Sequence, residues 1–194
     1  MRDPVIRAAF HRTILARAHQ DAKTFVIDEL GLKNGEIRAD IAVLNGKMIG
    51  YEIKTDKDNL VRLPSQVSAY SDVFDKAYVI VGEKYIQKVR ENLPEWWGVF
   101  CIKIDKQDFI SFEEVKPGEA NPQQNPYTIA QLLWKQEVVD LLQNKFNCVV
   151  KTSYTKPKLY EILVQQCSVE NLSKSVLQVI KSREGSRKDP ILLL

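Results

Sequence analysis

The pattern of apolar and polar positions is most informative between residues 24 and 54, where three short runs rich in β-branched residues follow one another. Residues 24–32 predict a first strand, and the two halves of residues 38–54 predict a second and a third. Asn-Gly, the dipeptide most typical of tight hairpins, stands at both connections, at 34–35 and 45–46. We therefore expect three consecutive antiparallel strands.

The length of the second turn decides which charged side chains share a face of this sheet. A two-residue loop would place Asp40 on the face opposite Glu52 and Lys54, because side chains alternate along a strand. A three-residue loop at 44–46 would place Asp40 opposite Gly50, on the same face as the other two. We predict the three-residue loop, with Gly50 leaving room for a ligand. In this register the other face of the sheet would be apolar and would consist of Ile37, Ala39, Ile41, Val43, Ile49, Tyr51 and Ile53.

Charged side chains inside apolar strands are rarely buried unless they are paired or bound to a metal. The oxygens of Asp40 and Glu52 suit Mg²⁺, which keeps several of its waters when bound. Lys54 could orient or deprotonate a water, or neutralise charge developing on a phosphate. Pairing across the first turn puts Glu29 opposite Asp40, where it could complete a metal site or hold Arg38. The same groups could instead form cross-strand salt bridges on a solvated face.

Two short motifs give these residues a family resemblance. Asp40, eleven intervening residues and then Glu52-Ile53-Lys54 resemble the D…E-x-K signature of the PD-(D/E)XK nuclease superfamily, with Ala39 in place of the usual proline. Gln66 and Tyr70 are similar to the Q-x-x-x-Y element of its RecB-like and Cas4-like exonuclease branch. The longer segment from residue 29 to residue 66 is also similar to a group of small, poorly characterised bacterial proteins that have the same nuclease-like core. The resemblance covers residues 24–100.

The resemblance implies a metal-dependent nuclease with a restriction-endonuclease-like fold, acting on DNA in repair, recombination or defence. Mg²⁺, for which Mn²⁺ may substitute, would be held by Asp40, Glu52 and the carbonyl of Ile53, with help from Glu29. Lys54 would position the attacking water or stabilise the phosphorane. The side chains implied to contact the nucleic-acid backbone are Gln66, Tyr70, Arg38 and Arg62.

We predict an α/β fold: a restriction-endonuclease-like core with a mixed central β-sheet flanked by helices, and a C-terminal helical appendage. The core would span residues 1–115, a linker rich in Pro, Asn and Gln residues 116–126, and the appendage with its basic tail residues 127–194. Besides the three strands, the expected elements are helices at 3–18, 64–74, 83–92, 128–144, 158–167 and 168–182 and strands at 77–82, 97–104 and 109–115.

The charge distribution permits a nucleic-acid partner. The net charge is only +3, yet residues 1–23 carry five Lys and Arg against two acids, residues 24–144 carry 14 against 19, and residues 145–194 carry nine against four. Basic ends around an acidic middle suit a carboxylate site with flanks that hold phosphates, and a solvated helical surface explains them equally well.

Other features narrow the class of protein. The sequence contains no apolar run long enough for a membrane span and no signal-peptide pattern, so we expect a cytoplasmic protein that does not contact membranes. Three widely spaced cysteines suggest neither a disulfide framework nor a zinc site. The alternative function is a non-catalytic module on the same fold, binding nucleic acid or protein. A third hypothesis is a subunit that forms a homodimer or a larger complex through its C-terminal helices.

Overall fold

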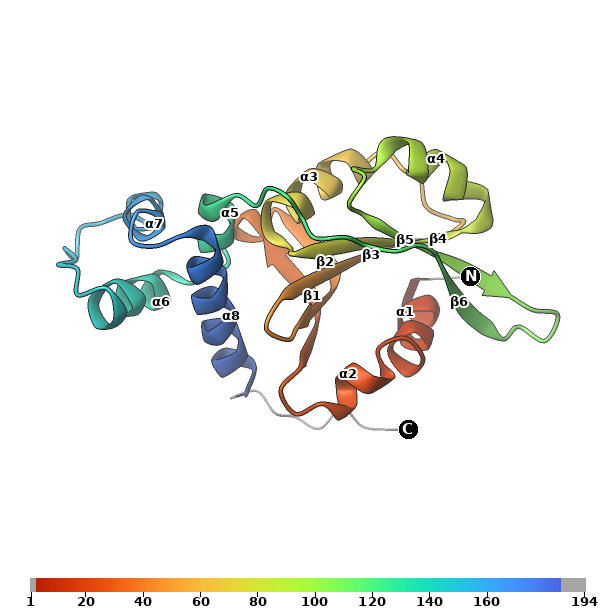
Figure 1. Cartoon of the computed structure of the whole chain (residues 1–194), viewed down its shortest axis with the longest axis horizontal. Helices are drawn as coiled ribbons and strands as arrows, with labels where there is room; N and C mark the ends of the chain where they lie inside the picture. The colour runs from red at the N-terminus through yellow and green to blue at the C-terminus, as the bar shows by residue number, and fades with distance from the viewer. Residues whose placement is uncertain (1–2, 186–194) are drawn as a thin grey trace.

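The computed structural model describes residues 3–185, and its centre is a six-stranded mixed sheet whose strands lie in chain order (Figure 1). The first three strands are antiparallel, the third to fifth are parallel, and the sixth is antiparallel to the fifth. The predicted α/β class with a mixed sheet is confirmed. The strands are β1 (Phe25–Leu32), β2 (Ile37–Leu44), β3 (Met48–Lys54), β4 (Lys76–Gly82), β5 (Gly98–Ile104) and β6 (Ile110–Lys116).

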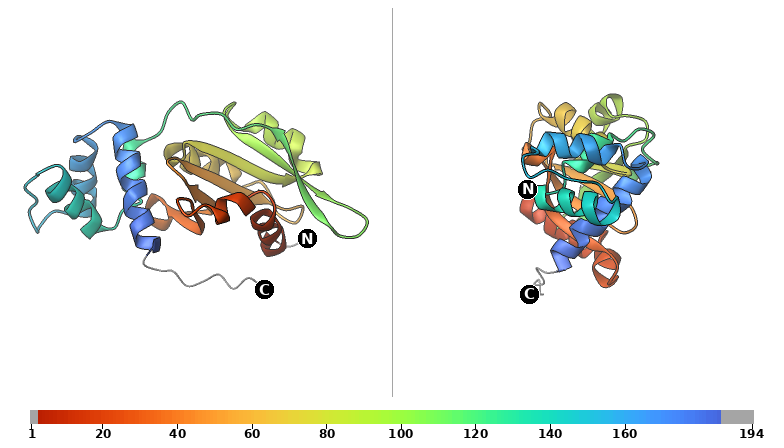
Figure 2. Two further views of the ribbon diagram at one scale, coloured as in Figure 1. Left: turned by 60° about the horizontal axis from the view of Figure 1, so that its bottom comes forward. Right: turned by 90° about the vertical axis from the view of Figure 1, so that its left-hand side faces the viewer.

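Helices cover both faces of the sheet (Figures 1 and 2). One face carries α1 (Asp3–Arg12) and α2 (Ala16–Gln20), and the other carries α3 (Leu63–Val73) and α4 (Ile86–Asn92). Each face has its own apolar cluster. The continuous apolar run of β4 serves both, because alternate side chains enter opposite clusters, as expected for a strand buried on both sides.

The C-terminal helices lie at the end of the sheet where β1 turns into β2 (Figure 2). Their apolar side chains belong to the same cluster as those between the sheet and α3. The hydroxyl of Tyr160 donates to the side chain of Asn34 in the β1–β2 turn at 3.0 Å. The elements are α5 (Pro126–Ala130), α6 (Lys135–Asp140), a π-helical turn (Leu141–Lys145), α7 (Lys156–Val164) and α8 (Val169–Gly185).

The prediction of one continuous helix at 128–144 is wrong, because the helix is interrupted at residues 131–134, between α5 and α6. The backbone N–H of Trp134 donates to the carboxylate of Glu137 at 2.7 Å and so starts a new helix. The hydroxyl oxygen of Tyr160 also lies 3.1 Å from the carbonyl oxygen of Leu133, which is in the break. Periodicity of apolar residues continues through such a break, so the pattern alone predicts a single helix.

The predicted helix at 3–18 is interrupted for a similar reason. The hydroxyl of Thr13 donates to the carbonyl of Ala9 at 2.8 Å, and the N–H of Leu15 reaches the carbonyl of Phe10 at 3.1 Å. A threonine hydroxyl that competes for a backbone carbonyl commonly bends or ends a helix. The result is two helices, α1 and α2, in place of one.

The segment predicted to be a linker is attached to α3. The side-chain amide of Asn121 donates to the carbonyls of Ser71 and Phe74 at 2.7 and 2.8 Å, and that of Gln124 donates to the carbonyl of Val73 at 2.7 Å. These bonds satisfy carbonyls that have no partner at a helix C-terminus. The predicted basic tail with its apolar end, residues 186–194, lies outside the described residues.

The turn between β2 and β3 differs from the prediction by two positions of register. Leu44 pairs with Met48, so the loop consists of residues 45–47 and not 44–46, with Gly46 in the left-handed region at φ 67°. A shift of two positions leaves the alternation of faces unchanged. Glu52 and Lys54 therefore still lie on the face opposite Ile41 and Val43.

The prediction that Gly50 leaves room for a ligand is wrong. Gly50 pairs with Ala42, and the space where its side chain would stand is filled by the buried ring of Phe74. An added Cβ would lie 2.5 Å from two ring carbons of Phe74. Gly50 therefore permits close packing of α3 on the sheet.

We expect Gly50→Ala to lower the free energy of unfolding by roughly 1–3 kcal/mol, the usual cost of overpacking a core. Urea denaturation followed by circular dichroism measures it. Gly31→Ala is the matched control, since its added Cβ would meet its nearest atom, Cα of Gly35, at 3.4 Å. Equal unfolding midpoints for wild type and Gly50→Ala would contradict this view of the α3 interface.

Candidate active site

A buried ion pair on β3 forms the centre of the candidate site. Glu52 is 1% exposed and Lys54 is 5% exposed. Lys54 Nζ donates to Glu52 Oε1 at 2.5 Å, and the amide of Gln66 on α3 donates to the same oxygen. Burial raises the pKa of Glu52, and the ammonium of Lys54 opposes this rise. The sequence-predicted glutamate, lysine and glutamine thus lie together on the α3 side of the sheet.

Tyr70 connects this pair to Asp40. Its hydroxyl donates to Glu52 Oε2 at 2.6 Å and accepts the backbone N–H of Asp40 at 3.1 Å. The ring is fully buried. Tyr70 is therefore placed to fix Glu52 relative to β2, and its burial argues against the expected direct contact with a nucleic-acid backbone.

Asp40 stands where β2 and β3 separate. The last pair of the ladder is Ile41 with Tyr51, and beyond it Asp40 Oδ2 accepts the backbone N–H of Ile53 at 2.7 Å. Burial, and then the nearby carboxylate of Glu52, raise the pKa of Asp40 to about 7. The carboxylate thus replaces a backbone partner at the fork between the two strands, next to the peptide that joins Glu52 to Ile53.

The expected single face for all three charged residues needs correction. Glu52 and Lys54 face α3, whereas the carboxylate of Asp40 also contacts Arg7 of α1, on the other side of the sheet, at 3.1 Å. Glu29, opposite Asp40, adopts φ 58° and interrupts the pairing of β1 with β2. Two residues of the predicted apolar face, Ile37 and Ala39, consequently pack toward α3 and not beside Ile41.

Glu29 lies opposite Asp40, as the predicted register of the first turn requires, but it does not hold Arg38. Its carboxylate pairs with Arg7 at 2.7 Å. Arg38 and Arg62 are exposed, and their side chains lie outside the buried cluster. The cluster itself therefore contains Asp40, Glu52, Lys54 and the α3 residues, while the two predicted arginines stand on the surface.

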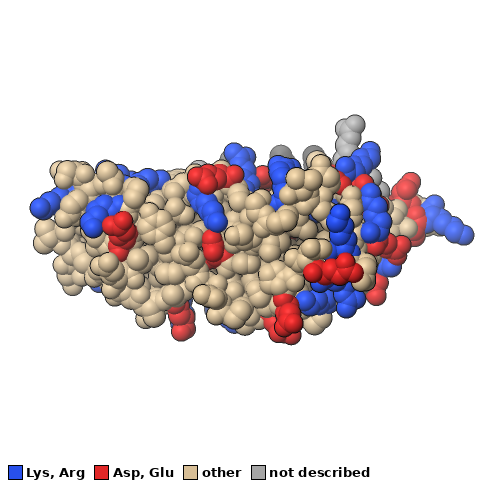
Figure 3. Space-filling view, turned by 90° about the horizontal axis from the view of Figure 1, so that it is seen from above, with Lys and Arg blue, Asp and Glu red and all other residues tan. Residues whose placement is uncertain are grey.

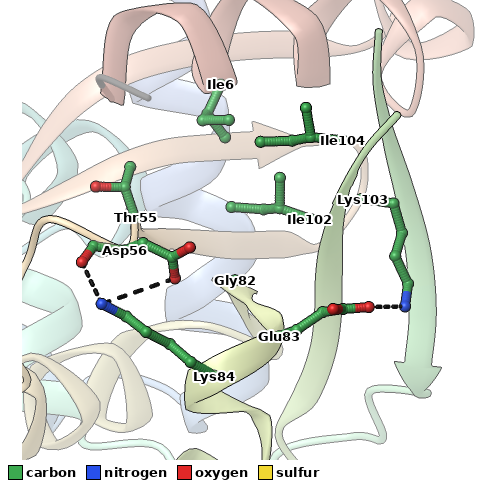
Figure 4. A pocket seen from close by; sticks show the side chains of 9 residues that line it. All are labelled: Ile6, Thr55, Asp56, Gly82, Glu83, Lys84, Ile102, Lys103 and Ile104. Carbon is green, nitrogen blue, oxygen red and sulfur yellow. Dashed lines mark hydrogen bonds and ion pairs between the residues drawn. The ribbon is translucent and has the colours of Figure 1, made fainter. Parts of the chain in front are cut away.

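A groove of about 420 Å³ opens at the carboxyl ends of β3, β4 and β5 (Figure 4), and Thr55 and Asp56, which follow Lys54 in the chain, line it. Two ion pairs lie along it, between Lys84 and Asp56 and between Lys103 and Glu83. The carboxyl ends of parallel strands are where α/β folds commonly bind ligands. The lining residues are Ile6, Thr55, Asp56, Gly82, Glu83, Lys84, Ile102, Lys103 and Ile104.

Comparison with known proteins places the chain in a family. Residues 2–192 match the family model described as Bacteriophage P4 protein cII. The chain belongs to this family. Protein cII of Enterobacteria phage P4 is 27% identical over 167 residues, which are 86% of this chain and 62% of that protein. The chain thus spans less than two thirds of the length of this relative.

The cII-family chain also has a distant likeness among solved structures. A protein of unknown function from Silicibacter pomeroyi matches 97% of this chain and 93% of its own, with 14% sequence identity and a TM-score of 0.41. In residues 3–185 of the cII-family chain, no helix is long and apolar enough to cross a membrane.

One residue of the cII-family site, Arg7, was not identified from the sequence. Its guanidinium pairs with Asp3, Glu29 and Asp40, which lie on three different elements. The i,i+4 spacing of Asp3 and Arg7 is a local signal for an ion pair. The contact with Asp40 spans 33 positions of sequence, and no local pattern reveals it.

The donor chemistry of the cII-family site fits a hard divalent cation. In the described part of the chain, no three His, Cys, Asp or Glu side chains are grouped closely enough to hold a metal. Mg²⁺ commonly needs only one or two carboxylates and keeps waters in its other positions. Asp40 and Glu52 supply two carboxylates. Nearby, on α1, Oδ1 of Asp3 is buried and has no hydrogen-bond partner.

Proposed function

We propose that this cII-family chain is a metal-dependent nuclease that hydrolyses phosphodiester bonds, with DNA as its substrate. The observation that carries the proposal is that the Tyr70 hydroxyl joins the backbone N–H of Asp40 to the carboxylate of Glu52, beside the buried ammonium of Lys54, while the Asp40 carboxylate accepts the N–H of the neighbouring Ile53. These residues are the ones that resemble the D…E-x-K and Q-x-x-x-Y motifs of PD-(D/E)XK nucleases. We place this activity in the cytoplasm, where its nucleic-acid substrate would be.

The energetics of burial support a functional role for Glu52 and Lys54. Taking two charges out of water costs several kcal/mol per ion, and well-packed apolar residues are often as stable or more so. Both side chains are nonetheless almost inaccessible to solvent. A charge pair that stability alone does not require is typical of a site where chemistry needs it.

The metal-holding groups would be the carboxylates of Asp40 and Glu52 and the carbonyl of Ile53, with Glu29 assisting. When bound there, Mg²⁺ or Mn²⁺ would polarise the scissile phosphodiester and lower the pKa of a water. Oxygen donors of this kind are the ligands that Mg²⁺ prefers. The orphaned Oδ1 of Asp3 shows that the site has more acceptor atoms than its own donors satisfy.

The remaining residues would position these groups and the substrate. Lys54 would hold a water or neutralise charge on the phosphate in the transition state. Gln66 and Tyr70 fix the carboxylate of Glu52 by the hydrogen bonds that they donate to it. Arg38 and Arg62, both exposed, would contact backbone phosphates of the substrate.

The distribution of surface charge indicates which part of the surface the nucleic acid would bind. On the face seen in Figure 3, basic and acidic side chains are interspersed and form no continuous basic track. A duplex lying across that face would meet repulsive carboxylates among the basic side chains. We therefore expect the substrate to lie at the carboxyl ends of the parallel strands, where Thr55 and Asp56, which follow Lys54 in the chain, line the groove.

An assay with end-labelled linear, circular and branched DNA, and with RNA of the same sequences, tests the proposal. We expect cleavage products from DNA with Mg²⁺ or Mn²⁺ and none with excess EDTA. Absence of products from every substrate with either metal would contradict the proposal. Product formation that EDTA does not reduce would contradict the metal dependence.

The second candidate function is a non-catalytic module that binds nucleic acid or protein. One observation favours it: Lys54, Gln66 and Tyr70 satisfy the carboxylate of Glu52 entirely within the chain, as in a structural hydrogen-bond network. The same substrates distinguish the two functions. Binding that Mg²⁺ does not change, with no product formed, is the result that this second candidate predicts.

A further inference from the structure

Arg7 lies where three carboxylates from three elements come together. Its guanidinium contacts Glu29 of β1 at 2.7 Å, Asp40 of β2 at 3.1 Å and Asp3 of its own helix at 3.4 Å. The side chain is only 15% exposed. A planar guanidinium can donate to several oxygens at once, which suits it to hold such a group together.

The charges around Arg7 do not balance. Three carboxylates face one guanidinium, and Lys54 is already paired with Glu52. Asp3 Oδ1 is buried and accepts no hydrogen bond, so an acceptor stands unused beside the guanidinium. A divalent cation would neutralise the negative charge that remains once Arg7 is paired.

The carboxylate oxygens of Asp40 already have hydrogen-bond partners that a bound metal would have to accommodate. The oxygens of the Asp40 carboxylate accept from Arg7 and from the backbone of Ile53, so neither is without a partner. A metal that binds Asp40 Oδ1 therefore shares this oxygen with the guanidinium, whose positive charge opposes the metal. The unused Oδ1 of Asp3 and the carboxylate of Glu29 are acceptors to which the guanidinium can still donate.

We propose that Arg7 is an internal cation that holds Asp40 before metal binds and competes with the divalent cation for that carboxylate. This inference rests on the proposed function, because it takes Asp40 to be a metal ligand. Metal binding weakens the contact of the guanidinium with Asp40 and leaves it with Asp3 and Glu29, which it already contacts. Arg7 is thus a positioning residue that sets how much divalent cation the site requires.

The test is a titration of the full chain with Mn²⁺, in which electron paramagnetic resonance reports free Mn²⁺. We expect Arg7→Gln to bind Mn²⁺ about tenfold more tightly than wild type, a usual size for the coupling between two competing ligands. Arg12→Gln removes the same charge from an exposed arginine of α1 and is expected to change the affinity less than about twofold. Equal affinities for wild type and Arg7→Gln would overturn the inference, as would an equal gain in Arg12→Gln.

Two further variants keep the test decisive if Arg7→Gln folds poorly. Arg7→Lys retains a cation but not the planar fork, and its affinity should fall between those of wild type and Arg7→Gln. In the Asp40→Asn background, Arg7→Gln should give no gain, since the contested ligand is gone. A gain of the same size there would overturn the inference.

Absence of Mn²⁺ binding by wild type would contradict the proposed function as well as this inference. Mg²⁺-dependent cleavage by wild type, with the same Mn²⁺ affinity in wild type and Arg7→Gln, would contradict this inference alone.

Discussion

Replacing Lys54 by methionine is expected to reduce Mg²⁺-dependent DNA cleavage at least about 100-fold, the usual effect of removing a group that transfers a proton or stabilises transition-state charge. Methionine fills a similar volume without the ammonium that contacts Glu52 at 2.5 Å. Single-turnover rates with excess protein measure the chemical step directly. Cleavage by Lys54→Met at the wild-type rate would contradict the assignment of Lys54.

The control for this variant has to separate chemistry from folding. Lys54→Met leaves the carboxylate of Glu52 buried without its cation, which can cost about 3–5 kcal/mol. The double variant Glu52→Gln/Lys54→Met removes both charges and should recover most of that stability while remaining inactive. Lys57→Met, at an exposed lysine three positions further on, should keep the rate within about threefold of wild type.

Replacing Asp40 by asparagine should sharply reduce cleavage and weaken Mn²⁺ binding. Asparagine retains the size of the side chain and an oxygen that can accept the N–H of Ile53, which Asp40 accepts at 2.7 Å. The lost charge removes one of the two carboxylates on which the proposed metal site depends. We expect the rate to fall at least about 100-fold, as for the loss of a principal group for transition-state charge.

Asp28→Asn is the matched control, because Asp28 pairs with Ile41 next to the site and its carboxylate contacts His11, at 3.0 Å, and not Arg7. It changes the net charge by the same amount at nearly the same place. We expect its rate and its Mn²⁺ affinity to stay within about threefold of wild type. Equal losses in the two variants would show that Asp40 acts only through the general electrostatic field.

Much of the sheet could be predicted from local patterns. Apolar periodicity and turn residues predict the three strands between residues 24 and 54 and the doubly buried β4. They also predict that Glu52 and Lys54 lie on the face of the sheet opposite Ile41. The i,i+4 spacing of Gln66 and Tyr70 likewise predicted that both side chains share one face of α3, and both contact Glu52.

The errors arise where one backbone angle or one distant contact decides the outcome. The change of face at Asp40 accompanies a left-handed Glu29, a conformation that non-glycine residues seldom adopt and that no pattern of apolar residues records. The ring that fills the space beside Gly50 comes from Phe74, beyond α3. Arg7 reaches Asp40 from another element, so its role is visible only in three dimensions.

The measurement that tests the central claim most directly is the single-turnover rate of DNA cleavage by wild type and Asp40→Asn in saturating Mg²⁺, at a temperature where both variants are folded. We predict metal-dependent products from wild type and a rate at least about 100-fold lower from Asp40→Asn. Rates within about twofold of each other would contradict the claim that Asp40 and Glu52 form one hydrolytic site.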